Sequence, residues 1–208
     1  MKVILARHAE TEWNRRGIIQ GHSDSAVTRR GMREADALAA ALEKNAFSIA
    51  RVYASPLGRA RLMGQRLAAS FHCPLFVEPA LKEQSFGRFE GMASDYFTHH
   101  YPADAEALFM RDAEYCPPGG ESLVQASRRI IDFLDHQQNI VMNNTNTICI
   151  VSHGHVIQGV LALLKEGHIN HFPRYSQPNA SYSVFALTNG TCTDLQWGIA
   201  SHLLHLER

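Results

Sequence analysis

Short, mostly apolar runs alternate with longer amphipathic stretches along this chain of 208 residues. Runs at residues 2–6, 51–54, 75–77 and 147–151 have the length and composition of buried β-strands. Strands that are buried on both faces lack a regular apolar–polar alternation, so these runs predict a sheet covered by helices. The pattern therefore indicates an α/β fold with a largely parallel central sheet.

The stretches between these runs have the apolar spacing of amphipathic helices. Thr28 is an expected N-cap, because apolar residues follow it at helical spacing through Leu42. Ser55-Pro56 is expected to open a second helix that runs to about residue 71, with proline at its favoured first position. Two further helices are predicted, one from about Gly120 and one at residues 154–164.

The middle of the chain, about residues 86–118, lacks a clean alternation of apolar and polar residues and contains glycines and prolines among short helical patches. We interpret it as a helical and irregular insertion near the active edge of a single domain spanning residues 1–208. Near the C-terminus, Asn189-Gly190 separates two apolar stretches at residues 181–187 and 191–197. This arrangement predicts a closing β-hairpin.

Composition narrows the classes of protein to which the chain can belong. Twenty lysines and arginines balance twenty aspartates and glutamates, which disfavours a nucleic-acid or membrane-surface binder that relies on bulk charge. The four scattered cysteines form no C-x-x-C pair, so reduced cytosolic thiols are favoured over a disulfide framework or a zinc site. Neither a signal-peptide core nor a membrane-spanning run is present, so we expect a cytoplasmic protein without a membrane partner.

Side chains with useful chemistry stand where the predicted strands end. Arg7 and His8 follow the first strand, Arg59 lies on the first turn after the second, Glu83 follows the third and His153 ends the fourth. Such ends meet at the sheet edge where ligands bind. Arginine and imidazole groups there would neutralise phosphoryl oxygens, His8 could attack phosphorus, and Glu83 could protonate a leaving oxygen. Each residue alone is more typical of a structural or solvated position, so the hypothesis rests on their joint placement.

Six blocks of sequence carry a resemblance to a known family. In chain order they are Arg7-His8-Ala9-Glu10-Thr11 with Asn14; Gln20-Gly21 with Asp24 and Val27-Thr28-Arg29-Arg30-Gly31; Ser55-Pro56-Leu57-Gly58-Arg59-Ala60; Leu81-Lys82-Glu83 with Phe86-Gly87 and Glu90-Gly91; Gly119-Gly120-Glu121-Ser122; and Val151-Ser152-His153-Gly154. Together they resemble the histidine phosphatase superfamily, in the branch that includes the cofactor-dependent phosphoglycerate mutases. The resemblance covers nearly the whole chain.

This resemblance implies a three-layer α/β/α sandwich with a mixed, mostly parallel sheet. It implies that His8 is the nucleophile and that Glu83 is the proton donor and later the base. The phosphoryl oxygens would be held by Arg7, Arg59 and His153. Further phosphate or substrate contacts are implied for Asn14, Thr11, Gln20, Gly21, Glu121 and Gly154. The family's hydrolysis needs neither a metal nor an organic cofactor, and we expect none here.

Two positions depart from the family pattern. Ala9 replaces the usual glycine of the first block, which adds a methyl group beside the nucleophile and leaves the local backbone conformation open. Gln84 stands where the mutases carry an arginine that helps to bind phosphoglycerate. We therefore favour a metal-independent hydrolase of a small phosphomonoester. The alternatives are a phosphoglycerate mutase and a non-catalytic, phosphate-binding regulatory module.

Two groups of apolar and aromatic residues leave alternatives open. The aromatic side chains of the insertion form either a substrate wall or the insertion's own core. They are Phe86, Phe89, Tyr96, Phe97, Tyr101, Phe109 and Tyr115. In the closing hairpin, Val184, Phe185 and Trp197 either pack inward or form a homodimer interface.

Overall fold

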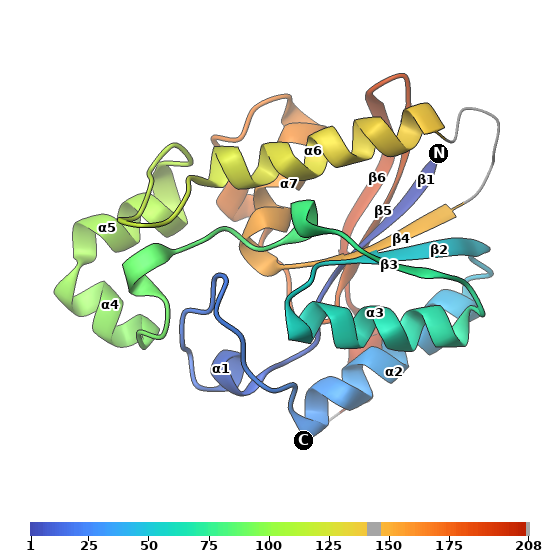
Figure 1. Cartoon of the computed structure of the whole chain (residues 1–208), viewed down its shortest axis with the longest axis horizontal. Helices are drawn as coiled ribbons and strands as arrows, with labels where there is room; N and C mark the ends of the chain where they lie inside the picture. Colours follow the sequence, from blue (N-terminus) through green and yellow to red (C-terminus); the bar gives the residue numbers. More distant parts are fainter. Residues whose placement is uncertain (141–146, 207–208) are drawn as a thin grey trace.

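A six-stranded mixed sheet forms the centre of the computed structural model, which describes residues 1–140 and 147–206 (Figure 1). The strand order is β3-β2-β4-β1-β5-β6. Four strands run parallel, namely β1 (Lys2–Arg7), β2 (Ile49–Ala54), β3 (Leu75–Val77) and β4 (Thr147–Ser152). The antiparallel part consists of β5 (Tyr182–Thr188) and β6 (Thr191–Ile199). The expected α/β fold with a mostly parallel sheet is confirmed.

Helices cover both faces of this sheet (Figure 1). Successive residues of a strand point to opposite faces of the sheet. In β1, Ile4 belongs to the apolar cluster on one face and Leu5 to the cluster on the other. The first cluster includes α2 (Arg29–Lys44) and α3 (Gly58–Ser70), and the second includes α6 (Leu123–Ile140) and α7 (Gly154–Glu166). The implied three-layer sandwich is therefore confirmed.

The helix starts agree with the sequence only in part. Thr28 caps α2 as predicted, since its side chain accepts a hydrogen bond from the Gly31 amide. The prediction that Ser55-Pro56 opens α3 was wrong, because the helix begins at Gly58. The Ser55 hydroxyl instead bonds the Leu57 amide and the His153 ring, which keeps this segment in a turn.

The helix predicted from about Gly120 also begins later than expected, at Leu123. Ser122 provides the reason, because its side chain accepts a hydrogen bond from the Gln125 amide in the manner of an N-cap. The preceding Gly119 has a φ of +76°, which no residue of a right-handed helix adopts. This turn brings Glu121 back beside Ser85, whose amide donates to the Glu121 carboxylate at 3.0 Å.

The insertion folds into short helices that lie beyond the carboxyl ends of the parallel strands (Figure 1). It contains α4 (Ser94–His100), α5 (Pro102–Glu106) and a π-helical turn at Ala107–Arg111. The two ends of the insertion are joined, since the Arg88 amide donates to the Pro118 carbonyl at 3.0 Å. A Cβ atom at Gly87, whose φ is +54°, would collide with that same carbonyl, so only glycine allows this close approach.

The insertion has an apolar cluster of its own, formed by Ile19, Phe86, Phe89, Phe97, Ala105 and Leu108. Phe89 and Phe97 are fully buried there, which supports the second of the two alternatives for the aromatic residues. Phe86 and Phe109 differ, because they also line the pocket described below. The N-terminal part of the chain contributes the short helix α1 (Glu12–Arg15), which is capped by Thr11.

The closing hairpin is formed as predicted. Asn189 and Gly190 have φ values of 50° and 74°, which a two-residue turn between twisted antiparallel strands requires. Phe185 packs inward, whereas Trp197 is 40% exposed and lies against Tyr175 at 5.2 Å between ring centroids. The homodimer interface stays a prediction.

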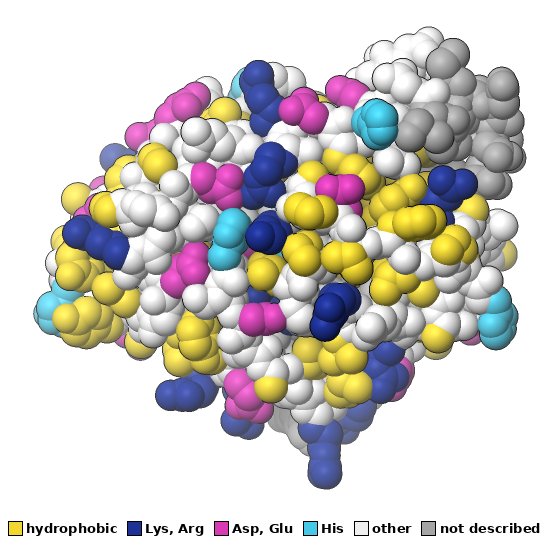
Figure 2. All heavy atoms as spheres, in the orientation of Figure 1, with side chains coloured by type: hydrophobic (Ala, Val, Ile, Leu, Met, Phe, Trp, Pro, Cys, Tyr) yellow, Lys and Arg dark blue, Asp and Glu magenta, His cyan; other side chains and the backbone are white. Residues whose placement is uncertain are grey.

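The surface matches the balanced charge of the sequence. Figure 2 shows acidic and basic side chains interspersed with apolar ones over the visible face. Within residues 1–140 and 147–206, no helix is long and apolar enough to cross a membrane.

Candidate active site

The carboxyl ends of the parallel strands and the insertion enclose a pocket of about 260 Å³. It lies where an open α/β sheet is expected to bind its ligand. The structure brings eight of the predicted site residues to its wall, namely Arg7, His8, Asn14, Gln20, Gly21, Arg59, Glu83 and Gly154. Of the five residues whose joint placement the sequence predicts, four line the pocket, namely Arg7, His8, Arg59 and Glu83, whereas His153 does not.

His8 follows β1 directly and is 3% exposed. Its Nδ1 lies 2.8 Å from the carbonyl oxygen of Ala9. A carbonyl only accepts hydrogen bonds, so the proton is on Nδ1 and the lone pair is on Nε2. Among the described residues, no hydrogen-bond partner occupies that Nε2. Burial first, and then the charges of Arg59 and Arg7, hold the pKa of His8 well below its ordinary value, so the ring stays neutral.

Arg7 lies beside the first residue of α7. A Cβ atom at Gly154 would lie only 3.0 Å from the guanidinium carbon of Arg7, so glycine is what admits the arginine here. One amino group of Arg7 donates to the carbonyl of Gln177, while its buried Nε has no partner among the described residues. The guanidinium is thus anchored on one side and available to an anion on the other.

Arg59 comes from the first turn of α3 and is 2% exposed. Its guanidinium donates to the carbonyl oxygens of Gly21 and Ser23, both at 2.7 Å, and to the Asp24 carboxylate at 3.0 Å. The Asp24 carboxylate also accepts the amide of Gly58, which starts the helix. These contacts fix a positive charge beside the pocket and bind the loop at residues 20–24 to α3.

His153 ends β4 and is fully buried, with its ring centroid 5.2 Å from that of His8. Its Nε2 lies 2.8 Å from the Ser55 hydroxyl, which itself accepts a hydrogen bond from the Leu57 amide. A hydroxyl can donate to Nε2 as well as accept from the Leu57 amide, and donation to Nε2 leaves the His153 proton on Nδ1. Nδ1 is buried and has no hydrogen-bond partner among the described residues. Burial is the first cause that holds the pKa of His153 well below its ordinary value.

Glu83 is held by the amino end of α7. One carboxylate oxygen accepts hydrogen bonds from the Val156 amide at 2.7 Å and the Gln84 amide at 2.9 Å, and the other accepts from the His155 amide at 3.0 Å. A helix amino terminus offers unpaired amides and a partial positive charge, which suits a carboxylate. The fold therefore presents Glu83 to the same pocket as His8 in a fixed orientation.

Two of the implied secondary contacts lie elsewhere. Thr11 is fully buried behind the pocket, where its hydroxyl bonds the side chains of Asn14 and Gln20. Glu121 pairs with Arg129 at 2.6 Å and does not line the catalytic pocket. Its carboxylate also accepts the Ser85 amide, so in this structure it bonds the neighbouring backbone, and its contact with a substrate stays a prediction.

The structure also reveals one residue that the sequence did not indicate, Asn179, and places His155, a weak candidate from the sequence, in the pocket wall. Asn179 donates to the His8 carbonyl at 3.0 Å and to the Asn14 side-chain oxygen at 3.2 Å, so it joins the strand end to the pocket wall. His155 lines the pocket between Phe86 and Phe109, and burial lowers its pKa to about 3. The block of residues 176–180 has no periodic pattern that would have marked Asn179.

The two departures from the family pattern are both accommodated. Ala9 is 1% exposed and its φ is not positive, so the backbone at this position does not require glycine. Gln84 is fully buried and its side chain donates to the Glu121 carbonyl at 2.8 Å. It therefore adds neither a charge nor a contact to the pocket.

Comparison with known proteins agrees with this geometry. Residues 3–200 match the family model described as the histidine phosphatase superfamily, branch 1. Phosphoserine phosphatase 1 of Hydrogenobacter thermophilus is 30% identical over 203 residues, which cover 98% of this chain and 94% of that protein. The metal-independent phosphoserine phosphatase of Arabidopsis thaliana is 31% identical over 205 residues, or 97% of this chain and 83% of the plant protein.

A solved structure supports the same grouping. The crystal structure of phosphoserine phosphatase from Entamoeba histolytica, in complex with 3-phosphoglyceric acid, is 29% identical and has a TM-score of 0.82. The match covers 98% of this chain and 99% of that one. Bacterial 2,3-bisphosphoglycerate-dependent phosphoglycerate mutases also match, at 25–26% identity over 78% of this chain.

Proposed function

The chain belongs to branch 1 of the histidine phosphatase superfamily, and from that premise we propose that it hydrolyses a small phosphomonoester through a covalent phosphohistidine on His8. It is a phosphatase of a phosphorylated metabolite. The observation that carries the proposal is the state of His8, a buried neutral imidazole with Nδ1 occupied and Nε2 open, in a pocket shared with Arg7 and Arg59.

In the first step, His8 Nε2 attacks phosphorus and the bond from phosphorus to the leaving oxygen breaks. The electron pair goes to the leaving oxygen, which Glu83 protonates. Arg7 and Arg59 neutralise the negative charge on the phosphoryl oxygens, and His153 donates its Nδ1 proton to one of them. The alcohol then leaves, and His8 carries the phosphoryl group.

In the second step, water attacks the phosphohistidine. Glu83, now a carboxylate, accepts a proton from this water as the new bond from oxygen to phosphorus forms. The bond between phosphorus and Nε2 breaks, inorganic phosphate leaves and His8 returns to its neutral state. Glu83 regains its proton in this step, so each turnover consumes one ester and one water.

The same residues explain hydrolysis without a metal. In phosphoryl transfer most of the catalytic work is positioning and neutralisation of charge, for which kinases use magnesium. Here two guanidinium groups and an imidazole donor supply that neutralisation. We expect no loss of activity in EDTA.

The substrate is proposed from the size and lining of the pocket. Its 260 Å³ lies just below the range of about 300–1,000 Å³ typical of sites for drug-sized ligands, which favours a small metabolite. Beyond the two arginines, the polar lining includes the uncharged side chains of Asn14, Gln20 and Gln158, which can bond an amine or carboxylate. Because two relatives are phosphoserine phosphatases, phosphoserine is the first candidate.

The mutase alternative finds less support. Gln84 points away from the pocket and supplies no cation for a phosphoglycerate. The distinguishing assay adds 3-phosphoglycerate with a bisphosphoglycerate primer and looks for 2-phosphoglycerate. We expect release of phosphate and no isomerisation.

The test of the proposed function is phosphate release from p-nitrophenyl phosphate, phosphoserine and other small phosphomonoesters, with EDTA present. The wild type and His8→Ala are compared, and His99→Ala serves as a control at an exposed histidine. We expect His8→Ala to lower kcat by at least about a thousandfold, and the control to match the wild type.

Two outcomes would oppose the proposal. Full activity of His8→Ala would show that another residue is the nucleophile. Binding of vanadate by the wild type without turnover of any ester would indicate the non-catalytic, phosphate-binding module instead.

We also place the enzyme in the cytoplasm. Its four cysteines are free thiols, which suits a reducing compartment. The only partner that this function requires is the small phosphomonoester, and neither nucleic acid nor a membrane takes part.

A further inference from the structure

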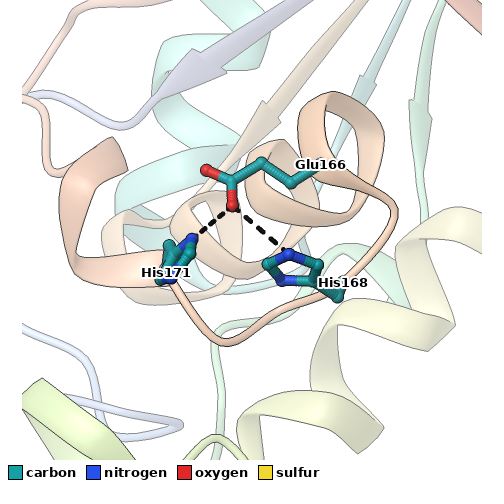
Figure 3. A group of neighbouring side chains, drawn as sticks. All are labelled: Glu166, His168 and His171. Carbon is teal, nitrogen blue, oxygen red and sulfur yellow. Dashed lines mark hydrogen bonds and ion pairs between the residues drawn. The ribbon is translucent and has the colours of Figure 1, made fainter.

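A second group of ligating side chains lies away from the catalytic pocket, at the carboxyl end of α7 (Figure 3). Glu166 is the last residue of the helix, and His168 and His171 follow in the next turn of chain. One ligand atom from each residue lies within 4.8 Å of the other two. His171 Nδ1 is 2.5 Å and His168 Nε2 is 3.7 Å from the same oxygen, Glu166 Oε2.

The backbone explains why these three side chains meet. Gly167 ends α7 with a φ of +75°, so the chain reverses and carries both histidines back toward Glu166. Tyr175 donates its hydroxyl to the other carboxylate oxygen, Oε1, at 2.8 Å. This contact from the next short helix holds the carboxylate with Oε2 turned toward the two imidazoles, as Figure 3 shows.

The electrostatics of the helix end favour a cation. The last carbonyls of the 13-residue α7 place partial negative charge at this end, where proteins usually put lysine, arginine or histidine and not glutamate. Tyr175 and His171 both hydrogen-bond the Glu166 carboxylate. An acidic side chain therefore stands against a negative helix end, with two imidazoles beside it.

We propose that Glu166, His168 and His171 bind a divalent ion of the late first transition row, of which Zn²⁺ is the type. Two imidazole nitrogens and one carboxylate oxygen form a donor set for zinc, whereas calcium and magnesium prefer oxygen alone. At ligand bonds of about 2.0–2.1 Å, tetrahedral donors lie about 3.4 Å apart, so closure from 4.8 Å is a small movement of exposed side chains. The side chains of His168 and His171 are 48% and 43% exposed, so water completes the coordination.

Binding requires a lone pair on His171 Nδ1. The proton that this nitrogen now donates to Glu166 moves to the other ring nitrogen or to water, and the bond to the metal takes its place. The ion would then join the end of α7 to the segment that begins at Phe172. Phe172 packs on the ring of His155 at 5.4 Å, so the ion braces the outer layer behind the catalytic pocket and takes no part in hydrolysis.

The test is titration with ZnSO₄ by calorimetry, using the full chain after EDTA treatment and dialysis. The variant His168→Ala/His171→Ala removes two donors, and His99→Ala/His100→Ala is the matched control, because it also removes two exposed neighbouring histidines. We expect the wild type and the control to bind one ion with micromolar affinity. The first variant should bind at least tenfold more weakly.

A second measurement separates loss of the site from loss of the fold. The melting temperature without metal should be similar in all three proteins, and zinc should raise it in the wild type and the control only. Glu166→Gln, which keeps an oxygen but removes the charge, should also weaken binding.

Equal affinity in the wild type and the His168→Ala/His171→Ala variant would overturn the proposal, as would the absence of micromolar binding in the wild type. Loss of binding in His8→Ala alone would place the ion in the catalytic pocket and contradict it too. Phosphatase activity in EDTA should be the same in the His168→Ala/His171→Ala variant and the wild type, so this test is independent of the proposed function.

Discussion

His8 and His153 lie beside each other, and each ring has one nitrogen within hydrogen-bond distance of an oxygen of the fold. The Ala9 carbonyl keeps the proton of His8 on Nδ1, and the Ser55 hydroxyl contacts Nε2 of His153. In the proposed reaction the two neighbouring imidazoles have opposite roles, since one presents a lone pair to phosphorus and the other presents a donor. Burial beside Arg59 keeps both rings neutral, because it holds both pKa values low.

At Glu83, the effect of a substitution should depend on the leaving group. Glu83→Gln keeps an oxygen for the amides of α7 but cannot supply a proton, so hydrolysis of phosphoserine should slow by about 10²–10⁴-fold. p-Nitrophenolate leaves well without protonation, so its ester should lose much less in the first step. The measurements are steady-state kcat for both esters and the rate of the p-nitrophenol burst. If the substitution slowed the p-nitrophenol burst as much as it slowed phosphoserine hydrolysis, the role of Glu83 as acid would be contradicted.

At Gly154, a single methyl group should disturb catalysis more than stability. In Gly154→Ala the new Cβ would lie 3.0 Å from the Arg7 guanidinium, which must move, and we expect kcat to fall about tenfold or more. Gly159→Ala, one turn further along α7, is the matched control. Its Cβ would collide with the Ser127 hydroxyl in the core, so the melting temperature should fall instead. Kinetics and thermal melts of both variants check the contrast.

Among the elements, the loop at residues 20–24 depends on Glu90 of the insertion. The Glu90 carboxylate accepts the amides of His22, Ser23 and Phe86 and the Ser23 hydroxyl. Burial alone would raise the pKa of Glu90, but these hydrogen bonds outweigh it and hold the pKa below its ordinary value. Because Arg59 bonds the Gly21 and Ser23 carbonyls, the insertion positions this arginine, a proposed phosphate ligand, through the loop.

Glu90→Gln should therefore lower both stability and activity. The amide has one acceptor oxygen for donors that now share two, so we expect a loss of about 2 kcal/mol in the free energy of unfolding and a severalfold fall in kcat. Glu12→Gln, which alters a half-exposed pair with Arg15, should change stability by less than about 1 kcal/mol. Urea unfolding and kcat measure both. An unchanged kcat in Glu90→Gln would separate the loop from catalysis.

Residues on regular elements could be predicted from the sequence, and residues on irregular ones largely could not. Thr28, Arg59 and His153 were placed correctly, because strand ends and helix caps have local patterns that survive in the fold. Glu121 does not line the pocket, and its ion pair with Arg129 joins it to a helix whose start was misjudged, so its substrate contact stays a prediction. Asn179 was missed, because a loop residue 171 positions from His8 meets it only through the sheet.

Across the whole molecule, buried neutral histidines link stability to pH. His8, His153 and His155 are all buried and all have lowered pKa values, for which burial is the largest cause. The unfolded chain protonates each of them near the ordinary value of 6.5, whereas the folded protein does not. The unfolded state therefore binds more protons below this pH, and stability falls as pH falls.

His155 offers the cleanest test of this linkage, since its pKa is about 3. Between about pH 6 and pH 4, the wild type should lose about 1.4 kcal/mol per pH unit for this residue. His155→Phe, placed among Phe86, Phe109 and Phe172, should remove that slope, whereas His100→Phe at an exposed position should keep it. Urea unfolding across this range measures the slopes, and identical slopes in the wild type and His155→Phe would refute the linkage.

The central claim is that the phosphoryl group passes through His8 Nε2, and the most direct measurement is to trap it there. The enzyme is mixed with ³²P-labelled phosphoserine, quenched in alkali within milliseconds and digested, and the labelled peptide is sequenced. The account predicts an alkali-stable, acid-labile label on His8 that is absent in His8→Ala and accumulates at the rate of the first step. Turnover by the wild type with no label on His8, or with the label on another residue, would contradict it.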